Sequence, residues 1–206
     1  MCYHTKLSKD IRSIEERFNV TLDQSEHADS KKYYHGFTYP KTPVISNADD
    51  HHIHFYNWGL VPFWASDDSI KKFNLNTKIE TINERAGFKG LVNKRCLIIA
   101  DGYYEWHWLD AKGKNRQKYL LTLPNDEVFV FGGLWSKWTN KNTGEIQNTY
   151  TIMTTEANEL VSEIHNSQKR MPVILSKENE KQWLNNEPME NFRHLQVDLK
   201  AVEVQH

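Results

Sequence analysis

The sequence predicts an α+β fold, in which a curled, mostly antiparallel, barrel-like β-sheet is flanked by helices in a single domain spanning residues 1–206. Many short runs of apolar and β-branched residues follow one another closely along the chain, which is typical of strands that curl into a barrel. The sequence shows neither alternating strand–helix units nor a glycine-rich phosphate loop, so we do not expect a doubly wound parallel sheet. No internal repeat or low-complexity linker divides the 206 residues.

The first half of the chain supplies one helix and several short strands. Residues 8–18 (SKDIRSIEERF) have apolar side chains at helical spacing, and Ser8 is a candidate N-cap. After this helix we expect a loop that leads into a short strand, a strand broken by glycine and proline, and a loop with a helix. These elements are expected at residues 33–47, 53–64 and 76–88.

The second half is richer in strands. Residues 95–108 (RCLIIADGYYEWHW) predict a buried strand, a tight turn at Asp-Gly and a second strand. Three further strand-like runs follow at residues 118–124, 128–138 and 148–155, and KNTGEI at 141–146 predicts a hairpin turn between the last two. The remaining elements are helices at 156–165 and 176–185 and strands at 171–175 and 194–204.

Charge and cysteine content limit the classes of function. With 26 Lys and Arg against 27 Asp and Glu, the net charge of −1 argues against a generally basic nucleic-acid coat but allows a local basic cleft. Two cysteines are too few for a disulfide framework and fit a reducing cytosol. The N-terminal stretch lacks the apolar segment of a signal peptide, and no stretch approaches the ~18 apolar residues of a membrane span. We therefore expect a cytoplasmic protein without a membrane partner, and we assume a monomer because the sequence gives no sign of oligomerisation.

Cys2 directly follows the initiator methionine, so removal of Met1 would leave one residue with both an α-amine and a thiol. The amine can condense with an aldehyde to an imine, and the neighbouring thiol can then close a five-membered thiazolidine ring. Both groups are partly in their nucleophilic forms near neutral pH. The alternative is that a cysteine at this position is incidental.

Two further residues are candidates for proton transfer. Glu105 lies between aromatic residues just after an apolar strand, where desolvation would raise its pKa toward neutrality, or it is a strand-end carboxylate facing water. His165 ends a predicted helix and is followed by Lys169 and Arg170, so it is a capping residue, a proton shuttle or part of a phosphate contact.

Other polar and aromatic clusters leave two interpretations each. Asn76, Lys78 and Glu80 alternate with other side chains in NTKIET and line a cleft or form an exposed loop. The aromatic residues around WGLVPFW, with Trp64 and Pro40, form a stacking platform for bases or part of the core. The HHIH run at 51–54 lacks a third nearby ligand, so we expect neither a metal nor another cofactor.

Taken in order, MC, WGLVPFW, NTKIET, KRCLIIADGYYEW, FGGLW, TIMTTEANELVSEIH and RMPVIL resemble the SRAP domain, the SOS-response-associated peptidase family of abasic-site processing proteins. The resemblance runs from Cys2 to about Leu175. It implies loss of Met1 by autocatalytic cleavage and a covalent thiazolidine crosslink between Cys2 and the ring-opened abasic site in single-stranded DNA. Such a crosslink shields the lesion and is reversible, which gives the protein a lyase-like character.

The resemblance also implies roles for single residues. Cys2 is the crosslinking nucleophile, Asn76 orients it, Glu105 is the acid and base, and His165 assists imine formation. The residues implied in DNA contacts are Pro40, Trp64, Lys78, Lys89, Thr154 and Arg170.

The chain departs from the family pattern in several places. Lysine replaces the usual arginine at Lys78 and Lys89, which keeps the charge but loses bidentate phosphate geometry, and NSQK forms extra residues between His165 and Arg170. Two other functions remain open. One is an N-terminal cysteine amidase or peptidase, which would act without DNA. The other is a non-catalytic single-strand binding module, which would not distinguish abasic from intact strands.

Overall fold

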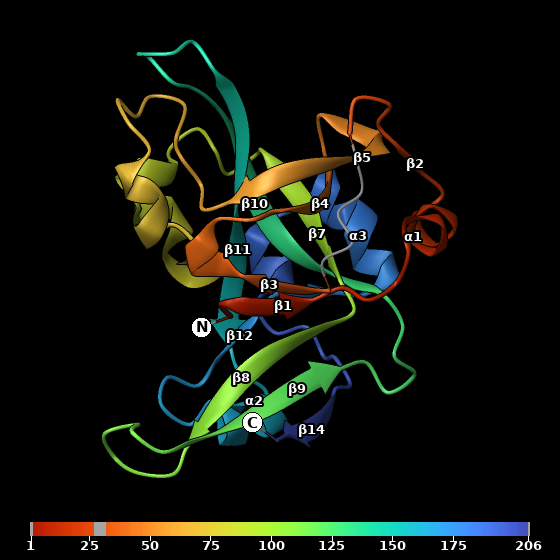
Figure 1. Cartoon of the computed structure of the whole chain (residues 1–206), viewed down its shortest axis with the longest axis vertical. Coiled ribbons are helices and arrows are strands. Elements are labelled where there is room, and N and C mark those ends of the chain that lie inside the picture. Colours follow the sequence, from red (N-terminus) through yellow and green to blue (C-terminus); the bar gives the residue numbers. More distant parts are fainter. Residues whose placement is uncertain (1, 27–31, 206) are drawn as a thin grey trace.

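The computed structural model describes residues 2–26 and 32–205, in which two β-sheets are flanked by helices (Figure 1). This arrangement confirms the predicted α+β fold. The smaller sheet is antiparallel with strand order β14-β9-β8-β1-β3. Its strands are β1 (His4–Lys6), β3 (Tyr33–His35), β8 (Gly102–Trp108), β9 (Arg116–Thr122) and β14 (Lys200–Val204).

The larger sheet has the order β12-β11-β10-β7-β4-β5-β2 and closes on itself. Its strands are β2 (Thr21–Leu22), β4 (Lys41–Ser46), β5 (Asp49–Trp58), β7 (Arg95–Ala100), β10 (Phe129–Thr139), β11 (Ile146–Glu156) and β12 (Arg170–Pro172). A parallel pairing of β5 with β11, at Asn57–Thr149 and Trp58–Tyr150, joins β11, β10, β7, β4 and β5 into a barrel. Two short strands extend it: β6 (Asn76–Lys78) pairs with β11, and β13 (Ile174–Leu175) pairs with β10.

The predicted hairpin around KNTGEI is confirmed, since β10 and β11 pair along seven residue positions on either side of it. Close packing at Gly133 in β10 shows why this hairpin carries glycine. A Cβ there would lie 2.2 Å from the Ile98 side chain on β7 and 2.7 Å from a backbone oxygen of β11. The barrel interior therefore leaves no room for a side chain at this position.

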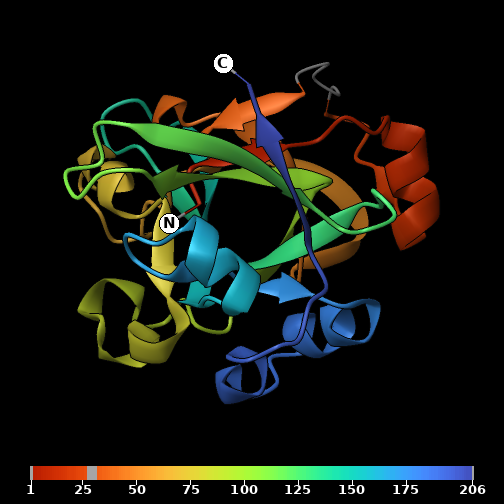
Figure 2. The same ribbon diagram turned by 90° about the horizontal axis from the view of Figure 1, so that it is seen from below.

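In the described part of the chain, three α-helices cover the sheets: α1 (Ile11–Phe18), α2 (Glu159–Ile164) and α3 (Lys177–Leu184). Figure 2 shows α2 and α3 on one side of the sheets, with α1 at the edge. The prediction of Ser8 as the cap of α1 is wrong, because Asp10 accepts the hydrogen bond from the Ser13 backbone N–H at 2.9 Å. No helix within residues 2–26 and 32–205 is long and apolar enough to cross a membrane.

The segment 95–108 forms two strands as predicted, but they belong to different sheets. The chain crosses from β7 of the barrel to β8 of the smaller sheet at Asp101. The Asp101 carboxylate fixes this corner by accepting hydrogen bonds from the backbone N–H and hydroxyl of Ser8, both at 2.6 Å, and from Lys6 Nζ at 2.8 Å. It thereby ties the strand that carries Glu105 to the N-terminal strand.

Three other predicted elements differ in extent. Residues 76–88 form the short strand β6 and two 3₁₀ helices, Ile79–Glu84 and Ala86–Phe88. Residues 171–175 divide between β12 and β13, and only the end of 194–204 is a strand.

Candidate active site

The N-terminal segment brings Cys2 between the two sheets. Strand β1 pairs with β8, placing His4 opposite Tyr104, so the chain before β1 runs toward Glu105. The Cys2 side chain is completely buried, and its backbone carbonyl accepts a hydrogen bond from Asn76 Nδ2 at 2.9 Å. Met1, whose removal the resemblance implies, lies outside the described residues.

Asn76 reaches Cys2 from the other sheet. It begins β6, which pairs in parallel with β11 and places Asn76 beside Ile152. Its Oδ1 atom is buried and has no hydrogen-bond partner within the described part of the chain. A buried carbonyl oxygen without a hydrogen-bond partner costs free energy. The Asn76 Oδ1 atom can therefore accept a hydrogen bond from a ligand that binds beside the Cys2 backbone.

Glu105 is a buried carboxyl on β8, with 3% of its surface exposed. Burial raises its pKa from 4.5 to about 7, because the charged form loses its hydration. The side chain is therefore divided between acid and carboxylate at neutral pH. This is the state that suits a group which donates a proton in one step and accepts it in another.

His165 follows the last turn of α2 and faces Glu105. Its Nδ1 lies 2.7 Å from the backbone carbonyl of Arg170, and since a carbonyl can only accept, Nδ1 carries the proton. Nε2 is then the basic nitrogen, and it lies 3.9 Å from Glu105 Oε2. Burial lowers the pKa of His165 to about 4, so the imidazole is neutral at pH 7.

The Cys2 thiol is held in its protonated form. Burial raises its pKa strongly, and the nearby Glu105 carboxylate raises it further. A thiol in this state can act as a nucleophile only when a base removes its proton.

A cleft of about 460 Å³ opens onto Glu105 and His165. Its other lining residues are Tyr3, His4, Phe37, Trp106, Trp108, Arg116, Ser167 and Gln168. The cleft has aromatic walls and polar groups at its base, the usual composition of a binding site. Phe37 is 49% exposed, so this wall presents an aromatic face to an incoming ligand.

The structure brings the four predicted catalytic residues together, whereas the six predicted DNA contacts lie outside the cleft that Glu105 and His165 line. None of the six lines the cleft with Glu105. Trp64, Lys78 and Lys89 are exposed, Pro40 is half-buried, and Lys78 is two residues from Asn76 on β6.

Thr154 and Arg170 are engaged inside the protein. The Arg170 guanidinium forms a two-point ion pair with Glu80, with nitrogen–oxygen distances of 3.0 and 2.8 Å, and also donates to the Thr154 carbonyl at 2.8 Å. Thr154 is fully buried, and its hydroxyl donates to the Thr77 carbonyl. A contact between Arg170 and DNA therefore requires Glu80 to release the guanidinium.

Sequence reasoning missed several cleft residues. Phe37 lies in the short 3₁₀ helix Gly36–Thr38, and the others lie at strand ends or in a turn, where no periodicity indicates which way a side chain points: Trp108, Arg116, Ser167 and Gln168. One available signal was the extra NSQK segment after His165, which supplies Ser167 and Gln168.

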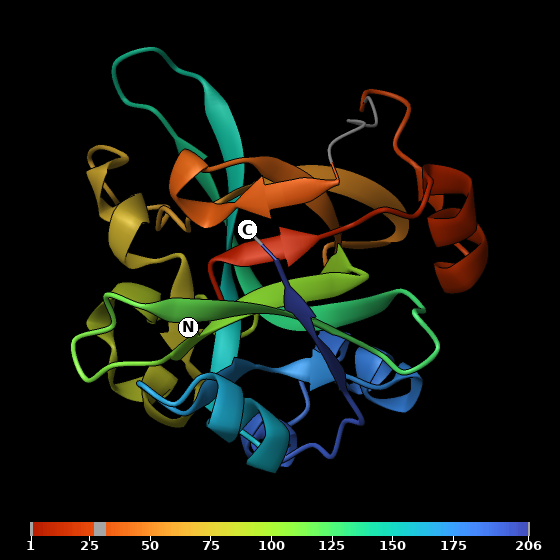
Figure 3. The same ribbon diagram turned by 60° about the horizontal axis from the view of Figure 1, so that its bottom comes forward.

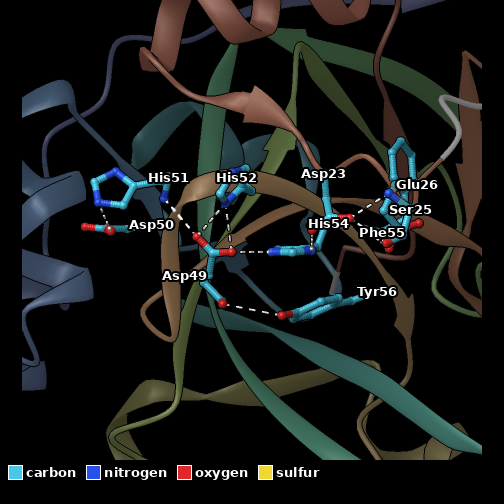
Figure 4. A network of polar contacts seen from close by, with 11 residues as sticks. Asp23, Ser25, Glu26, Asp49, Asp50, His51, His52, His54, Phe55 and Tyr56 are labelled. Carbon is cyan, nitrogen blue, oxygen red and sulfur yellow. Dashed lines mark hydrogen bonds and ion pairs between the residues drawn. The ribbon is translucent and has the colours of Figure 1, made fainter.

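The HHIH run forms a hydrogen-bonded cluster around Asp49 (Figure 4). Asp49 Oδ2 accepts from His52 Nδ1 at 2.9 Å and from His54 Nε2 at 3.0 Å. Burial alone would raise the pKa of Asp49, but these hydrogen bonds hold it at about 2. Among residues 2–26 and 32–205, no group of three or more His, Cys, Asp or Glu side chains has the geometry of a metal site.

Comparison with known proteins matches this chain to one family. The family model of the SOS response associated peptidase (SRAP) matches residues 1–205. The abasic site processing protein YoqW of Bacillus subtilis is 38% identical over 186 residues, which cover 90% of this chain and 80% of YoqW. The abasic site processing protein HMCES of Gallus gallus is 33% identical over 141 residues, covering 57% of this chain and 40% of HMCES.

Solved structures agree with this placement. A crystal structure of a protein from Bacteroides thetaiotaomicron superimposes with a TM-score of 0.88 at 30% identity, covering 99% of this chain and 92% of that one. A second, from Bordetella bronchiseptica, has a TM-score of 0.81 at 21% identity over the full length of both chains, and shows the same fold. The chain belongs to the SOS response associated peptidase (SRAP) family.

Proposed function

We propose that this protein processes abasic sites in single-stranded DNA by forming a covalent thiazolidine between Cys2 and the ring-opened sugar. The observation that carries the proposal is that Cys2, Asn76, Glu105 and His165 come together from separate elements, with Glu105 and His165 lining the cleft. Relatives that are named abasic site processing proteins support the choice of substrate.

The reaction begins with the amine that Met1 removal exposes on Cys2. The amine nitrogen attacks the C1′ aldehyde carbon of the ring-opened abasic site to give a carbinolamine. Glu105 in its acid form protonates the departing hydroxyl, water leaves, and an imine remains. A pKa of about 7 makes the acid form of Glu105 available for this step at neutral pH.

The thiol then closes the ring. The sulfur bonds to the imine carbon, and a proton is added at the nitrogen, so the whole sequence releases one water and involves no oxidation or reduction. His165 Nε2 and the Glu105 carboxylate are the two bases that can accept the proton of the thiol. Burial keeps the thiol protonated until the amine has reacted. Reversal follows the same steps backward, with Glu105 protonating the leaving nitrogen.

The remaining residues of the site orient the reactants. Asn76 fixes the Cys2 backbone, so the amine approaches the aldehyde from one direction. Lys78 and Lys89 supply surface charge toward the DNA backbone, and Trp64 with Pro40 supplies an apolar surface for flanking bases. Thr154 and Arg170 support the strand next to His165, and Arg170 contacts DNA only after leaving Glu80.

The test is a denaturing gel of the Met-processed protein with a single-stranded oligonucleotide that carries one abasic site. We expect a shifted band that survives heating, and a mass equal to the sum of protein and DNA minus one water. Cys2→Ser should give far less adduct and none that survives heat, because an oxygen ring is less favourable. If Cys2→Ala formed as much heat-stable adduct as the unmodified protein, the proposal would be wrong.

The same preparation separates this function from an amidase or a peptidase. An acyl transfer at Cys2 would turn over amide substrates without DNA. We expect no such turnover, and DNA-independent hydrolysis that disappears in Cys2→Ala would overturn the proposal.

A further inference from the structure

The loop between β8 and β9 is a rigid arm at the edge of the cleft. Figure 3 shows it projecting from the end of the smaller sheet. The Asp110 carboxylate accepts hydrogen bonds from the backbone N–H groups of Lys112, Lys114 and Asn115 at 2.8, 3.2 and 2.6 Å. Leu109 N–H closes the loop on the Asn115 carbonyl at 3.0 Å. The Asp110 side chain thus orders the loop through hydrogen bonds to the backbone of the loop itself.

The base of the arm is Trp108, which is fixed from two directions. Gly113 has a φ of +61°, and a Cβ on it would lie 2.6 Å from the Trp108 indole, so the loop backbone lies directly against the ring. Asn166 holds the Trp108 backbone in a reciprocal pair: Trp108 N–H donates to Asn166 Oδ1, and Asn166 Nδ2 donates to the Trp108 carbonyl, both at 3.0 Å. Asn166 belongs to the NSQK segment, which therefore couples the arm to the His165 loop.

Arg116 extends from this base into the cleft. Its Nε donates to the Gly113 carbonyl, and its guanidinium carbon lies 5.1 Å from the centre of the Trp108 ring. The terminal guanidinium nitrogens make no hydrogen bond or ion pair with any residue that the structure describes. A guanidinium whose stem is fixed and whose fork is open matches the geometry of a phosphate.

Arg116 is also the cationic side chain of the cleft. Among the described residues that line it, no other is a lysine or an arginine. The two lining histidines, His4 and His165, are neutral at pH 7, because burial lowers the pKa of each to about 4. Arg170 is held by Glu80, so it does not supply this charge.

We propose that Arg116, held by Trp108 and Gly113, binds a phosphodiester of the DNA strand next to the reacting nucleotide. This proposal rests on the proposed function for the nature of the strand. Its basis is the set of contacts that aims an unpaired guanidinium into the cleft lined by Glu105 and His165.

The experiment measures the salt dependence of non-covalent binding. Fluorescence anisotropy of an abasic single strand is followed from 50 to about 300 mM NaCl in the Cys2→Ala background, where no crosslink forms. Each phosphate contact contributes about 0.7 to the slope of log affinity against log salt for single strands. We expect Arg116→Ala to reduce that slope by about 0.7 and to weaken binding severalfold at low salt.

Two variants serve as controls. Arg116→Lys keeps the charge, so the slope should remain while affinity falls in part through loss of the fork. Lys112→Ala removes an exposed charge of the same loop that does not line the cleft, and the slope should stay as in the parent. A slope unchanged in Arg116→Ala, or reduced equally in Lys112→Ala, would overturn the proposal.

Crosslinking by the protein with Cys2 intact separates the two proposals. A normal crosslink together with an unchanged slope refutes the role of Arg116 alone. A reduced slope without any crosslink refutes the proposed function alone. Absence of binding to any single strand refutes both.

Discussion

Glu105→Gln provides a quantitative test of the electrostatics of the site, because glutamine keeps the shape of the side chain and removes its titration. In the folded protein, burial raises the pKa of Glu105 to about 7, against 4.5 in an exposed chain. Between pH 4.5 and about pH 7, the folded state therefore keeps a proton on Glu105 that the unfolded state has already released. Stability contributed by the protonated form is fully present below pH 4.5 and is lost as the pH rises through 7.

The size of the effect follows from the two pKa values. The difference of about 2.5 between the two pKa values corresponds to about 3 kcal/mol, at 1.36 kcal/mol for each pKa unit. Since Glu105 is 3% exposed, solvent screening reduces this figure little. About 1 kcal/mol is already lost at pH 5, so the wild type should lose about 2–3 kcal/mol relative to Glu105→Gln between pH 5 and pH 8.

Urea unfolding of both proteins at pH 5 and pH 8 measures this change. His165 titrates with the opposite sign, because burial lowers its folded pKa to about 4 and its stabilising effect grows as the pH rises toward 6.5. Both proteins contain it, so its contribution cancels in the difference to first order. Glu84→Gln, an exposed carboxylate of the 3₁₀ helix Ile79–Glu84, is the matched control and should show no such divergence. A stability difference between wild type and Glu105→Gln that is the same at both pH values would refute a buried, protonated Glu105.

Two further substitutions test the framework around the site. Gly133→Ala should lower the stability by about 1–3 kcal/mol, because its Cβ would lie 2.2 Å from the Ile98 side chain; an unchanged melting temperature in calorimetry would contradict this packing. Glu80→Gln should cost about 1.5–3 kcal/mol in urea unfolding through loss of the ion pair with the largely buried Arg170 guanidinium, whereas the exposed Glu84→Gln should be neutral. Equal stability of the two glutamine variants would show that the Glu80–Arg170 pair contributes nothing.

The sequence predicts local elements well and their long-range pairing poorly. The hairpin of β10 and β11 could be recognised because KNTGEI separates two runs of apolar and β-branched residues. Closure of the barrel depends on the parallel pairing of Trp58 with Tyr150, which are 92 residues apart, and no local pattern encodes that contact. The same limit applies at Asp101, where a predicted tight turn is a crossing between sheets fixed by hydrogen bonds to Ser8.

For the site, residue types were predictable and their electrostatic environment was only partly so. The resemblance supplied Cys2, Asn76, Glu105 and His165 together, and the aromatic neighbours of Glu105 already suggested desolvation. The ion-pair partner of a charged side chain could not be predicted from the sequence, because it depends on which elements meet in space. Arg170 illustrates the point, since its two-point pair with Glu80 joins residues that are 90 positions apart.

Under the proposed function, burial implies that chemistry and DNA binding are carried by different residues. The burial that raises the pKa of Glu105 also lowers that of His165, so near neutral pH the site holds a partly protonated carboxyl and an uncharged imidazole. Such a pair moves protons without a large change in net charge, but it attracts a phosphate chain weakly. With a net charge of −1 over the whole chain, the proposed attraction to DNA has to come from exposed cations, such as Arg116 in the cleft and Lys78 outside it. Salt should therefore weaken the encounter with DNA far more than the proton transfers that follow it.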